Sequence, residues 1–511
     1  MTDYSDINSI NSRIEELLKE EDFLEALEVA NIAIDKFPES FDFYFIAGVC
    51  HKRLGNYDSA IKFFNKSIDL NDSFFSSYDL LSDLYLSKPS PYNYILAKEN
   101  LEAALMLQPH NSEIKDKLSV TLISLREYSE ALKLIDELRE IDADNKYYLF
   151  RRAQCLSLMG RGEEALKELN SYERSEYIFD AQFSQQLGVA YHSLEDFPKA
   201  REIYYDMLDD KNIDKFPEMK LAIYNNACET LRMDEENNPE EFIEFTKKAV
   251  EIYPNDLTLR KNYLVANIYQ KNEKTIKEEI DLLTSLFPLD RAVAALELYV
   301  NNQYQTQKKS KFCDDPFKFI KSYNLMDFTK DYSKEINQII QNLQEINMIF
   351  DQPFKTDVGA KRTEVNLALI KNPVFEKLFL KISEILEVYK KDIKNIENNH
   401  FVNMWPEDLY YNAWSMFAGK NAFHVSHNHE EAWISGVLYL DVPDEIKGNE
   451  GSIVFDTLGY RFPKIKKERN FVYKPERGGI VFFPAHVWHH TIPHKEDKDR
   501  ICLPFNICSK K

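Results

Sequence analysis

The sequence predicts a chain of the α+β multidomain class, in which an all-α solenoid of helical repeats precedes a double-stranded β-helix, or jelly roll, with flanking helices. A 34-residue interval between recurring alanines predicts the solenoid, and a series of short β segments near the C-terminus predicts the jelly roll. The length of 511 residues supports this division, because one hydrophobic core does not extend over so long a chain. We expect the solenoid over 1–295, a helical junction over 296–343 and the β-rich domain over 344–511.

In the first part, an alanine recurs at a nearly constant interval. It stands at Ala26, Ala60, Ala97, Ala131, Ala165 and Ala200, which are 34, 37, 34, 34 and 35 residues apart. Three residues before the alanine is an aromatic residue, namely Phe23, Tyr57, Tyr94, Tyr128 and Phe197, and only Gly162 breaks the series. Pairs of antiparallel helices explain both features, because a small side chain lets the helices approach closely and the aromatic ring fills the space beside it.

Small residues and turns recur at matching places. Ala47-Gly48 and Leu187-Gly188 occupy the first helix of their copies, and Leu54-Gly55-Asn56-Tyr57 reads as the turn between two helices. These residues resemble the tetratricopeptide repeat over roughly the first 290 residues, in about eight copies. The resemblance implies a curved solenoid that binds a protein or peptide, and no residue in this part indicates catalysis.

The pattern changes after the repeats. From about Asn301 to Leu343 we expect polar helix, and a short basic run at 308–311 reads as a solvated surface. Apolar residues at helical spacing predict an amphipathic helix from Pro373 to Ile396. Eight short strands are expected beyond it, at 410–417, 422–425, 433–440, 451–455, 471–473, 479–483, 488–492 and 500–507.

Composition limits the classes of partner and location. The net charge of −21 at pH 7 repels phosphate backbones and anionic lipids, so we expect no nucleic acid and no membrane as a partner. No apolar run approaches the roughly 18 residues of a membrane span, and the polar N-terminus does not resemble a signal peptide. The six scattered cysteines read as free thiols of a reducing compartment, which predicts a cytoplasmic protein.

Histidines gather near the C-terminus. Of the 11 in the chain, seven lie within about 70 residues, namely His424, His427, His429, His486, His489, His490 and His494. His427 and His429 end one predicted strand, and alternate residues of a strand point to one face, so both could hold one ion. His489 follows the strand Gly479 to Phe483, and Arg500 opens the last strand. Non-haem iron(II) requires such a ligand set, which leaves open positions for a bidentate oxo-acid and dioxygen.

The segment from about 400 to 508 resembles the iron(II)- and 2-oxoglutarate-dependent dioxygenases, in particular a bacterial and phage group. The motifs that carry the resemblance are His427-x-His429, Ser435-Gly436-x-x-Tyr439, Phe483-Pro484, His489, Arg500 and Phe505-Asn506. The resemblance implies that His427 and His489 bind iron(II), that Arg500 binds the distal carboxylate of 2-oxoglutarate, and that dioxygen is the oxidant. Arginine suits this role because its planar guanidinium makes a two-point contact with a carboxylate.

Two positions depart from the family pattern. The wider superfamily has a carboxylate where this chain has His429, so the third metal ligand is either His429 or a substitute such as Glu431 or Asp456. The group also tends to have serine where this chain has Cys502, beside the co-substrate position. Tyr439 is a candidate co-substrate contact, because it points into the barrel if the strand alternates from Ser435. The remaining histidines read as pocket lining or surface residues, and Trp414 and Trp433 as core or pocket wall.

Three functions remain open at this point. The first is an iron(II)- and 2-oxoglutarate-dependent hydroxylase whose repeat array recruits a polypeptide or partner. The second is a cupin-type metalloenzyme, because Gly478, Pro484 and His489 also fit that group, although a cupin has no need of Arg500. The third is a non-catalytic repeat scaffold with a degenerate barrel. Neither the substrate, nor the hydroxylated atom, nor the oligomeric state follows from the residues.

Overall fold

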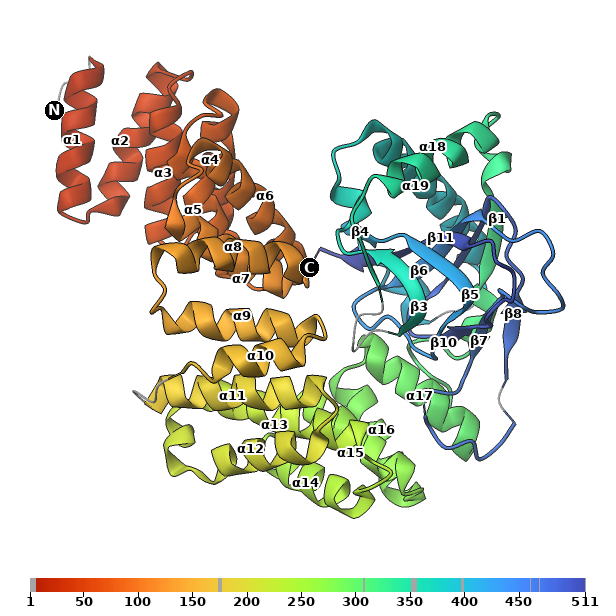
Figure 1. Cartoon of the computed structure of the whole chain (residues 1–511). Coiled ribbons are helices and arrows are strands. Elements are labelled where there is room, and N and C mark those ends of the chain that lie inside the picture. The colour runs from red at the N-terminus through yellow and green to blue at the C-terminus, as the bar shows by residue number, and fades with distance from the viewer. Residues whose placement is uncertain are drawn as a thin grey trace. The chain divides into compact units, whose positions relative to one another are not determined.

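The computed structural model describes residues 6–172, 177–306, 308–350, 356–396, 399–459, 461–467 and 469–510 (Figure 1). The chain divides into two compact units, Met1–Cys155 and Leu156–Lys510. Helical repeats make up the first unit and continue into the second, where they precede a β-rich domain. The predicted class, a helical solenoid followed by an antiparallel β fold, is therefore confirmed.

The first unit consists of antiparallel helix pairs. Its helices are α1 (Ile7–Lys19), α2 (Phe23–Lys36), α3 (Phe41–Arg53), α4 (Tyr57–Leu70), α5 (Phe75–Leu86), α6 (Pro91–Leu107), α7 (Ser112–Ser124), α8 (Tyr128–Ile141) and the greater part of α9 (Lys146–Leu158). The recurring alanines of this unit, Ala26, Ala60, Ala97 and Ala131, are all fully buried. A Cβ added to Gly48 would stand 2.7 Å from the ring of Phe64, which explains the small residue in the first helix. Gly55, at a φ of +79°, forms the predicted turn between α3 and α4.

The repeats of the second unit are also pairs of antiparallel helices. Their helices are α10 (Gly162–Leu169), α11 (Tyr177–Ser193), α12 (Phe197–Asp209), α13 (Pro217–Met233), α14 (Pro239–Ile252), α15 (Leu257–Tyr269), α16 (Glu273–Leu286) and α17 (Arg291–Tyr304). Gly162, the exception in the aromatic series, lies where a Cβ would meet Ser193 and Leu194 at 2.5 and 2.6 Å. An aromatic ring therefore has no room at that position.

The β-rich domain contains two antiparallel sheets. The strands are β1 (Lys321–Asn324), β2 (Met348–Phe350), β3 (Asp357–Thr363), β4 (Leu409–Ala413), β5 (Met416–His424), β6 (Ile434–Asp441), β7 (Ile453–Asp456), β8 (Phe471–Tyr473), β9 (Gly479–Pro484), β10 (Trp488–Thr491) and β11 (Arg500–Ser509). The large sheet has the order β1-β9-β6-β11-β5-β3-β2, with β4 also paired to β11, and the small sheet has the order β10-β7-β8. Apolar side chains of both sheets, among them Val437, Phe455 and Phe483, form one core cluster between them.

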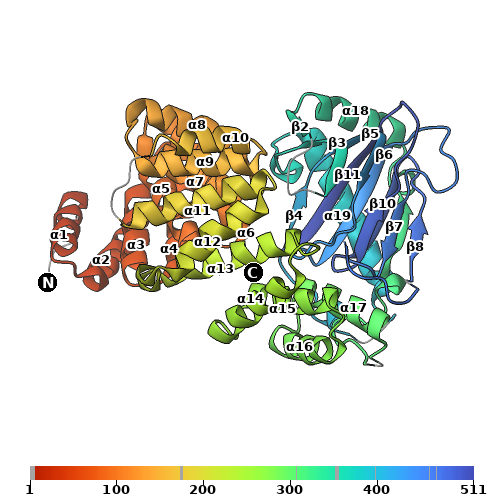
Figure 2. The ribbon, with the colours of Figure 1, turned by 60° about the horizontal axis from the view of Figure 1, so that its bottom comes forward.

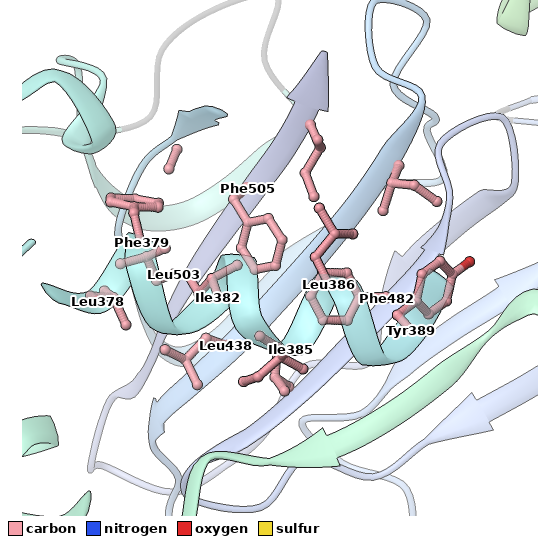
Figure 3. Close-up of a cluster of buried hydrophobic side chains, with 14 of the residues drawn as sticks. Leu378, Phe379, Ile382, Ile385, Leu386, Tyr389, Leu438, Phe482, Leu503 and Phe505 are labelled. Carbon is pink, nitrogen blue, oxygen red and sulfur yellow. The ribbon is translucent and has the colours of Figure 1, made fainter. Parts of the chain in front are cut away.

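Helix α19 (Pro373–Ile393) covers the other face of the large sheet (Figure 1). Its buried residues, including Leu378, Ile382 and Ile385, pack against Phe482 of β9 and Phe505 of β11 (Figure 3). The amphipathic helix expected from Pro373 is thus confirmed. Because successive strand residues point to opposite faces, this packing turns the alternate residues of the same strands toward the small sheet.

Several boundaries differ from the prediction. The break expected between 417 and 422 was wrong, because β5 runs without interruption to His424 and the chain turns earlier, at 414–415. There the backbone N–H of Ser415 donates to the Thr363 hydroxyl at 3.0 Å. The strands β2 and β3 were not predicted at all. The expected helical junction over 296–343 also contains a strand, since β1 pairs with β9 at the edge of the large sheet.

All six cysteines are buried thiols that form no disulfide. None of the helices that the structure describes combines the length and the apolar character needed to cross a bilayer.

Candidate metal centre

A pocket between the two sheets brings the predicted site residues together. Its lining includes His427, His429 and His489 at one place and Tyr439, Arg500 and Cys502 at another. The alternation of β6 and β11 explains this, because Tyr439 and Cys502 are register partners whose side chains point away from α19. Residues separated by up to 75 positions (His427 to Cys502) thus face one cavity.

The three histidines form a cluster with the spacing of metal ligands. One ring nitrogen from each lies within 4.8 Å of the others. Within the described part of the chain, it is the only cluster of three or more His, Cys, Asp or Glu side chains with a spacing that could hold an ion. His427 and His429 follow β5, whereas His489 lies on β10 of the small sheet. The cluster therefore joins the two sheets.

The backbone fixes the tautomer of two of these histidines. Nδ1 of His427 donates to the carbonyl oxygen of Val425 at 2.8 Å, and Nδ1 of His489 donates to that of Val487 at 3.0 Å. In both cases the acceptor is the residue two positions earlier. A proton held on Nδ1 leaves the lone pair of Nε2 free, which is the form that binds a metal.

His429 is held differently. Its Nδ1 lies 3.3 Å from the amide nitrogen of Asn506, and the same amide nitrogen lies 3.4 Å from a carboxylate oxygen of Glu431. The Ser435 hydroxyl donates to the Asn506 oxygen at 2.7 Å. In this orientation Asn506 donates to Nδ1, so that His429 carries its proton on Nε2. An amide that turned its oxygen to His429 would select the other tautomer. Asn506 and Ser435 belong to the quoted motifs, but sequence reasoning assigned them no role.

Burial keeps the three imidazoles neutral. It lowers the pKa of His427 to about 4, with a further lowering by the neighbouring His424. Burial and then the adjacent imidazoles lower the pKa of His429 and His489 well below the ordinary value. A neutral imidazole is the metal-binding species, so this environment suits a bound cation.

Arg500 supplies the positive charge of the pocket. It is 1% exposed, and its Nη1 donates to the carbonyl oxygen of Gly451 at 2.5 Å. Its Nε is buried and has no hydrogen-bond partner among the described residues. A buried guanidinium is costly without an acceptor of opposite charge, so its environment fits an anionic group that enters the pocket. Burial raises the pKa of the nearby Cys502 to about 11, which keeps its thiol protonated.

The two carboxylates considered as substitute ligands lie outside the cluster. Asp456 accepts from the backbone N–H of Leu458 at 2.9 Å and pairs with His490 at 3.1 Å. The carboxylate of Glu431 faces the side-chain amide of Asn506 and not the imidazoles of the cluster. The donor set of the described residues is thus three imidazoles. Nitrogen ligands of this kind suit iron(II), although they also suit other divalent transition metals.

The other histidines have separate positions. His424 lines the pocket, and its Nε2 lies 3.1 Å from a carboxylate oxygen of Asp357. His490 pairs with Asp456 as described. His486 and His494 are buried at 1% and 0% exposure. The ring of Trp414 lines the pocket 6.0 Å from that of His429, and Trp433 is part of the core under α19.

Comparisons with known families match three stretches of the chain. A model described as "Putative 2OG-Fe(II) oxygenase" matches residues 412–506, which include all the motifs quoted for that resemblance. Two tetratricopeptide repeat models match residues 12–73 and 92–151. The chain therefore carries tetratricopeptide repeats followed by a domain of the 2OG-Fe(II) oxygenase type. No curated protein matches it.

Three solved structures are similar to parts of the chain. YrrB, described as a TPR protein with an unusual peptide-binding site, has 23% identity and a TM-score of 0.31, over 39% of this chain and 97% of that chain. MamA from Desulfovibrio magneticus RS-1 has 16% identity and a TM-score of 0.28, over 32% of this chain and 89% of its own. Naa15/Naa10 bound to HypK-THB has 15% identity and a TM-score of 0.30, over 57% and 44% respectively.

Proposed function

We propose that the β-rich domain is an iron(II)- and 2-oxoglutarate-dependent dioxygenase that hydroxylates a polypeptide or partner recruited by the repeat array. The observation that carries this proposal is the buried Arg500, which lines the same pocket as three neutral imidazoles and whose Nε has no hydrogen-bond partner among the described residues. A cation site and an anion site in one cavity are what a metal-chelating dicarboxylate requires.

In this proposal each residue has a defined role. His427 and His489 bind the metal through Nε2, because backbone carbonyls hold their Nδ1 protons. His429 is the third ligand in the tautomer that leaves Nε2 free, which requires the Asn506 amide to turn its oxygen to Nδ1. Arg500 binds the distal carboxylate of 2-oxoglutarate, with Tyr439 and Cys502 beside it on neighbouring strands. Bound iron(II) supplies the activation of dioxygen, coupled to oxidative decarboxylation of 2-oxoglutarate to succinate and carbon dioxide.

Arg500 also separates this function from the alternatives. A cupin-type metalloenzyme shares the histidines but needs no buried guanidinium in the barrel. A non-catalytic scaffold needs neither the neutral imidazoles nor an unpartnered donor. The match of the oxygenase family model over residues 412–506 favours the dioxygenase as well.

The repeats support a partner that is a protein or a peptide, since solenoids of helix pairs contribute binding surface rather than chemistry. The six buried cysteines, which form no disulfide, support a reducing, cytoplasmic location.

Conversion of 2-oxoglutarate to succinate by the full-length protein with iron(II) and dioxygen tests the proposal. We expect slow conversion without a substrate, as a dioxygenase shows when oxidation is uncoupled from hydroxylation. An iron-loaded protein that binds 2-oxoglutarate but never converts it would favour the scaffold, and one that does not bind 2-oxoglutarate would favour the cupin-type enzyme.

A further inference from the structure

Helix α17, the last repeat helix, contacts the β-rich domain along a single stripe. The stripe consists of Arg291, Ala295, Tyr299 and Gln303, which are four residues apart and therefore share one face of the helix. Figure 2 shows α17 beside the end of the small sheet formed by β10 and β7. Both elements belong to the second compact unit.

The first residue of the stripe holds the turn that follows His429. Arg291 donates from Nε to the carbonyl oxygen of Glu430 at 3.1 Å and from Nη2 to that of Glu431 at 3.4 Å. Lys261 of α15 adds an ion pair to the Glu430 carboxylate at 2.7 Å. The two residues directly after a proposed metal ligand are thus held by repeat helices.

The second residue of the stripe holds the strand that carries His489. The indole N–H of Trp488, the residue before His489, donates to the carbonyl oxygen of Ala295 at 3.1 Å. The Trp488 ring also packs edge-on against Phe462, with the ring centroids 5.7 Å apart. The position of β10 at the ligand therefore depends on α17.

The second half of the stripe holds a loop that carries no ligand. The Tyr299 hydroxyl donates to the carbonyl oxygen of Pro463 at 2.8 Å. The side-chain oxygen of Gln303 accepts the backbone N–H groups of Ile465 and Lys466, each at 2.8 Å. Tyr299 and Gln303 are 0% and 1% exposed, so this end is more deeply buried than the half-buried Arg291.

We infer that α17 positions the metal ligands His429 and His489, with Arg291 and Trp488 as positioning residues, and that the last repeats are part of the metal site as well as of the binding array. This inference rests on the proposed metal site. Ligands must be held to within about 0.5 Å of their productive geometry, and the groups behind them typically change metal affinity by about 10- to 100-fold. The first half of the stripe, Arg291 and Ala295, contacts the segments that carry His429 and His489. The second half, Tyr299 and Gln303, contacts the loop at 463–466 instead.

Cobalt(II) binding to the full-length protein tests the inference without 2-oxoglutarate. Cobalt(II) reports both affinity and ligand geometry through its visible absorption. We expect Arg291→Gln to weaken cobalt(II) binding by about three- to tenfold and to change the spectrum, because the turn after His429 loses two donors. Arg291→Lys, which keeps one donor and the charge, should recover part of the affinity. Trp488→Phe keeps an aromatic ring but loses the indole donor, and it should weaken binding in the same way.

Tyr299→Phe is the matched control, because it removes a buried hydrogen bond from the same stripe at a loop without a ligand. It should lower thermal stability but leave the cobalt(II) affinity and spectrum as in the parent. Equal weakening by Tyr299→Phe and Arg291→Gln would show a general loss of stability and overturn the inference. So would parent-like binding in both Arg291→Gln and Trp488→Phe. If the parent itself bound no cobalt(II), the proposed metal site would fail instead.

Discussion

His427 and His489 form an isolated antiparallel β-bridge in which each backbone N–H donates to the carbonyl oxygen of the other, at 3.0 and 2.9 Å. Their ring centroids are 4.2 Å apart. Because two backbone hydrogen bonds hold the pair, the spacing of the two imidazoles is a property of the fold. The bridge therefore holds the two proposed metal ligands at this spacing through the backbone alone.

The ligand pair itself gives the first prediction. We expect His427→Ala and His489→Ala each to abolish iron(II) binding and 2-oxoglutarate turnover, because a site that retains only two imidazoles loses most of its affinity. His490→Ala is the control, since His490 neighbours His489 but faces Asp456. Metal content after anaerobic loading is the measurement. Full iron occupancy in either ligand variant would remove that residue from the ligand set.

Arg500 gives a prediction that concerns the co-substrate alone. Arg500→Lys keeps the charge but loses the planar two-point contact, so the apparent KM for 2-oxoglutarate should rise by the equivalent of about 1.5 to 3 kcal/mol. Arg500→Ala should lose more, because the carboxylate would be buried without a partner. Iron affinity should stay nearly unchanged in both variants. Parent-like 2-oxoglutarate binding by calorimetry would make Arg500 structural and remove the main support for the dioxygenase.

The environment of His429 predicts a variant with higher metal affinity than the parent. Glu431 attracts the amide nitrogen of Asn506, and the same nitrogen then donates to Nδ1 of His429. Glu431→Gln offers Asn506 a donor instead, so that the amide can turn its oxygen to His429 and free Nε2 for the metal. We expect metal affinity to rise severalfold, within the roughly 10- to 100-fold range of such groups. Glu445→Gln, at an exposed acid, should have no effect. An unchanged or lower affinity in Glu431→Gln would contradict this account.

Acid stability is expected to depend on His486, whose pKa burial lowers to about 3. Its ring packs edge-on against Phe312, and its Nδ1 is buried without a partner among the described residues. Below its unfolded pKa of about 6.5, the unfolded chain takes up a proton that the folded chain rejects, so stability falls as the pH falls. Between pH 6.5 and 5.5 this loss amounts to about 1 kcal/mol.

The variant His486→Leu should lack this contribution. Urea unfolding at several pH values would show a shallower acid slope in the variant than in the parent, whatever its absolute stability. Identical slopes would mean that the His486 pKa is not lowered in the folded state.

The domain boundary predicted at residue 295 can be tested by truncation. Buried residues of α15 to α17, including Leu264 and Tyr299, share one core cluster with Phe462 of the β-rich domain, and Trp488 packs against that cluster. We therefore expect 156–511 to fold alone and 296–511 to lose cooperative unfolding, because its core would be exposed. Circular dichroism melts of both fragments are the measurement. A cooperative transition in 296–511 would support the predicted boundary.

The helical repeats could be predicted because their determinants are local and recur. Each copy repeats the buried alanine and its aromatic neighbour, so that a single period identifies the packing of every pair. The pocket residues on strands were also predictable, because strand alternation assigns Tyr439, Arg500 and Cys502 to one face without knowledge of the rest of the chain. Strands β1 and β3 were not, since they pair with β9 and β5, far away in the sequence, and β2 in turn pairs with β3.

The sequence by itself therefore determined the repeat array, the jelly roll and the residue types of the site, which depend on local periodicity and on motif spacing. Only the tertiary structure decided how His429 is held by Asn506, how Arg500 Nε lacks a partner within the described part of the chain, and how α17 contacts the segments beside His429 and His489. These features are contacts between residues that are distant in the chain. A hydrogen bond across such a distance depends on the packed positions of both partners, and neither partner's neighbouring residues encode it.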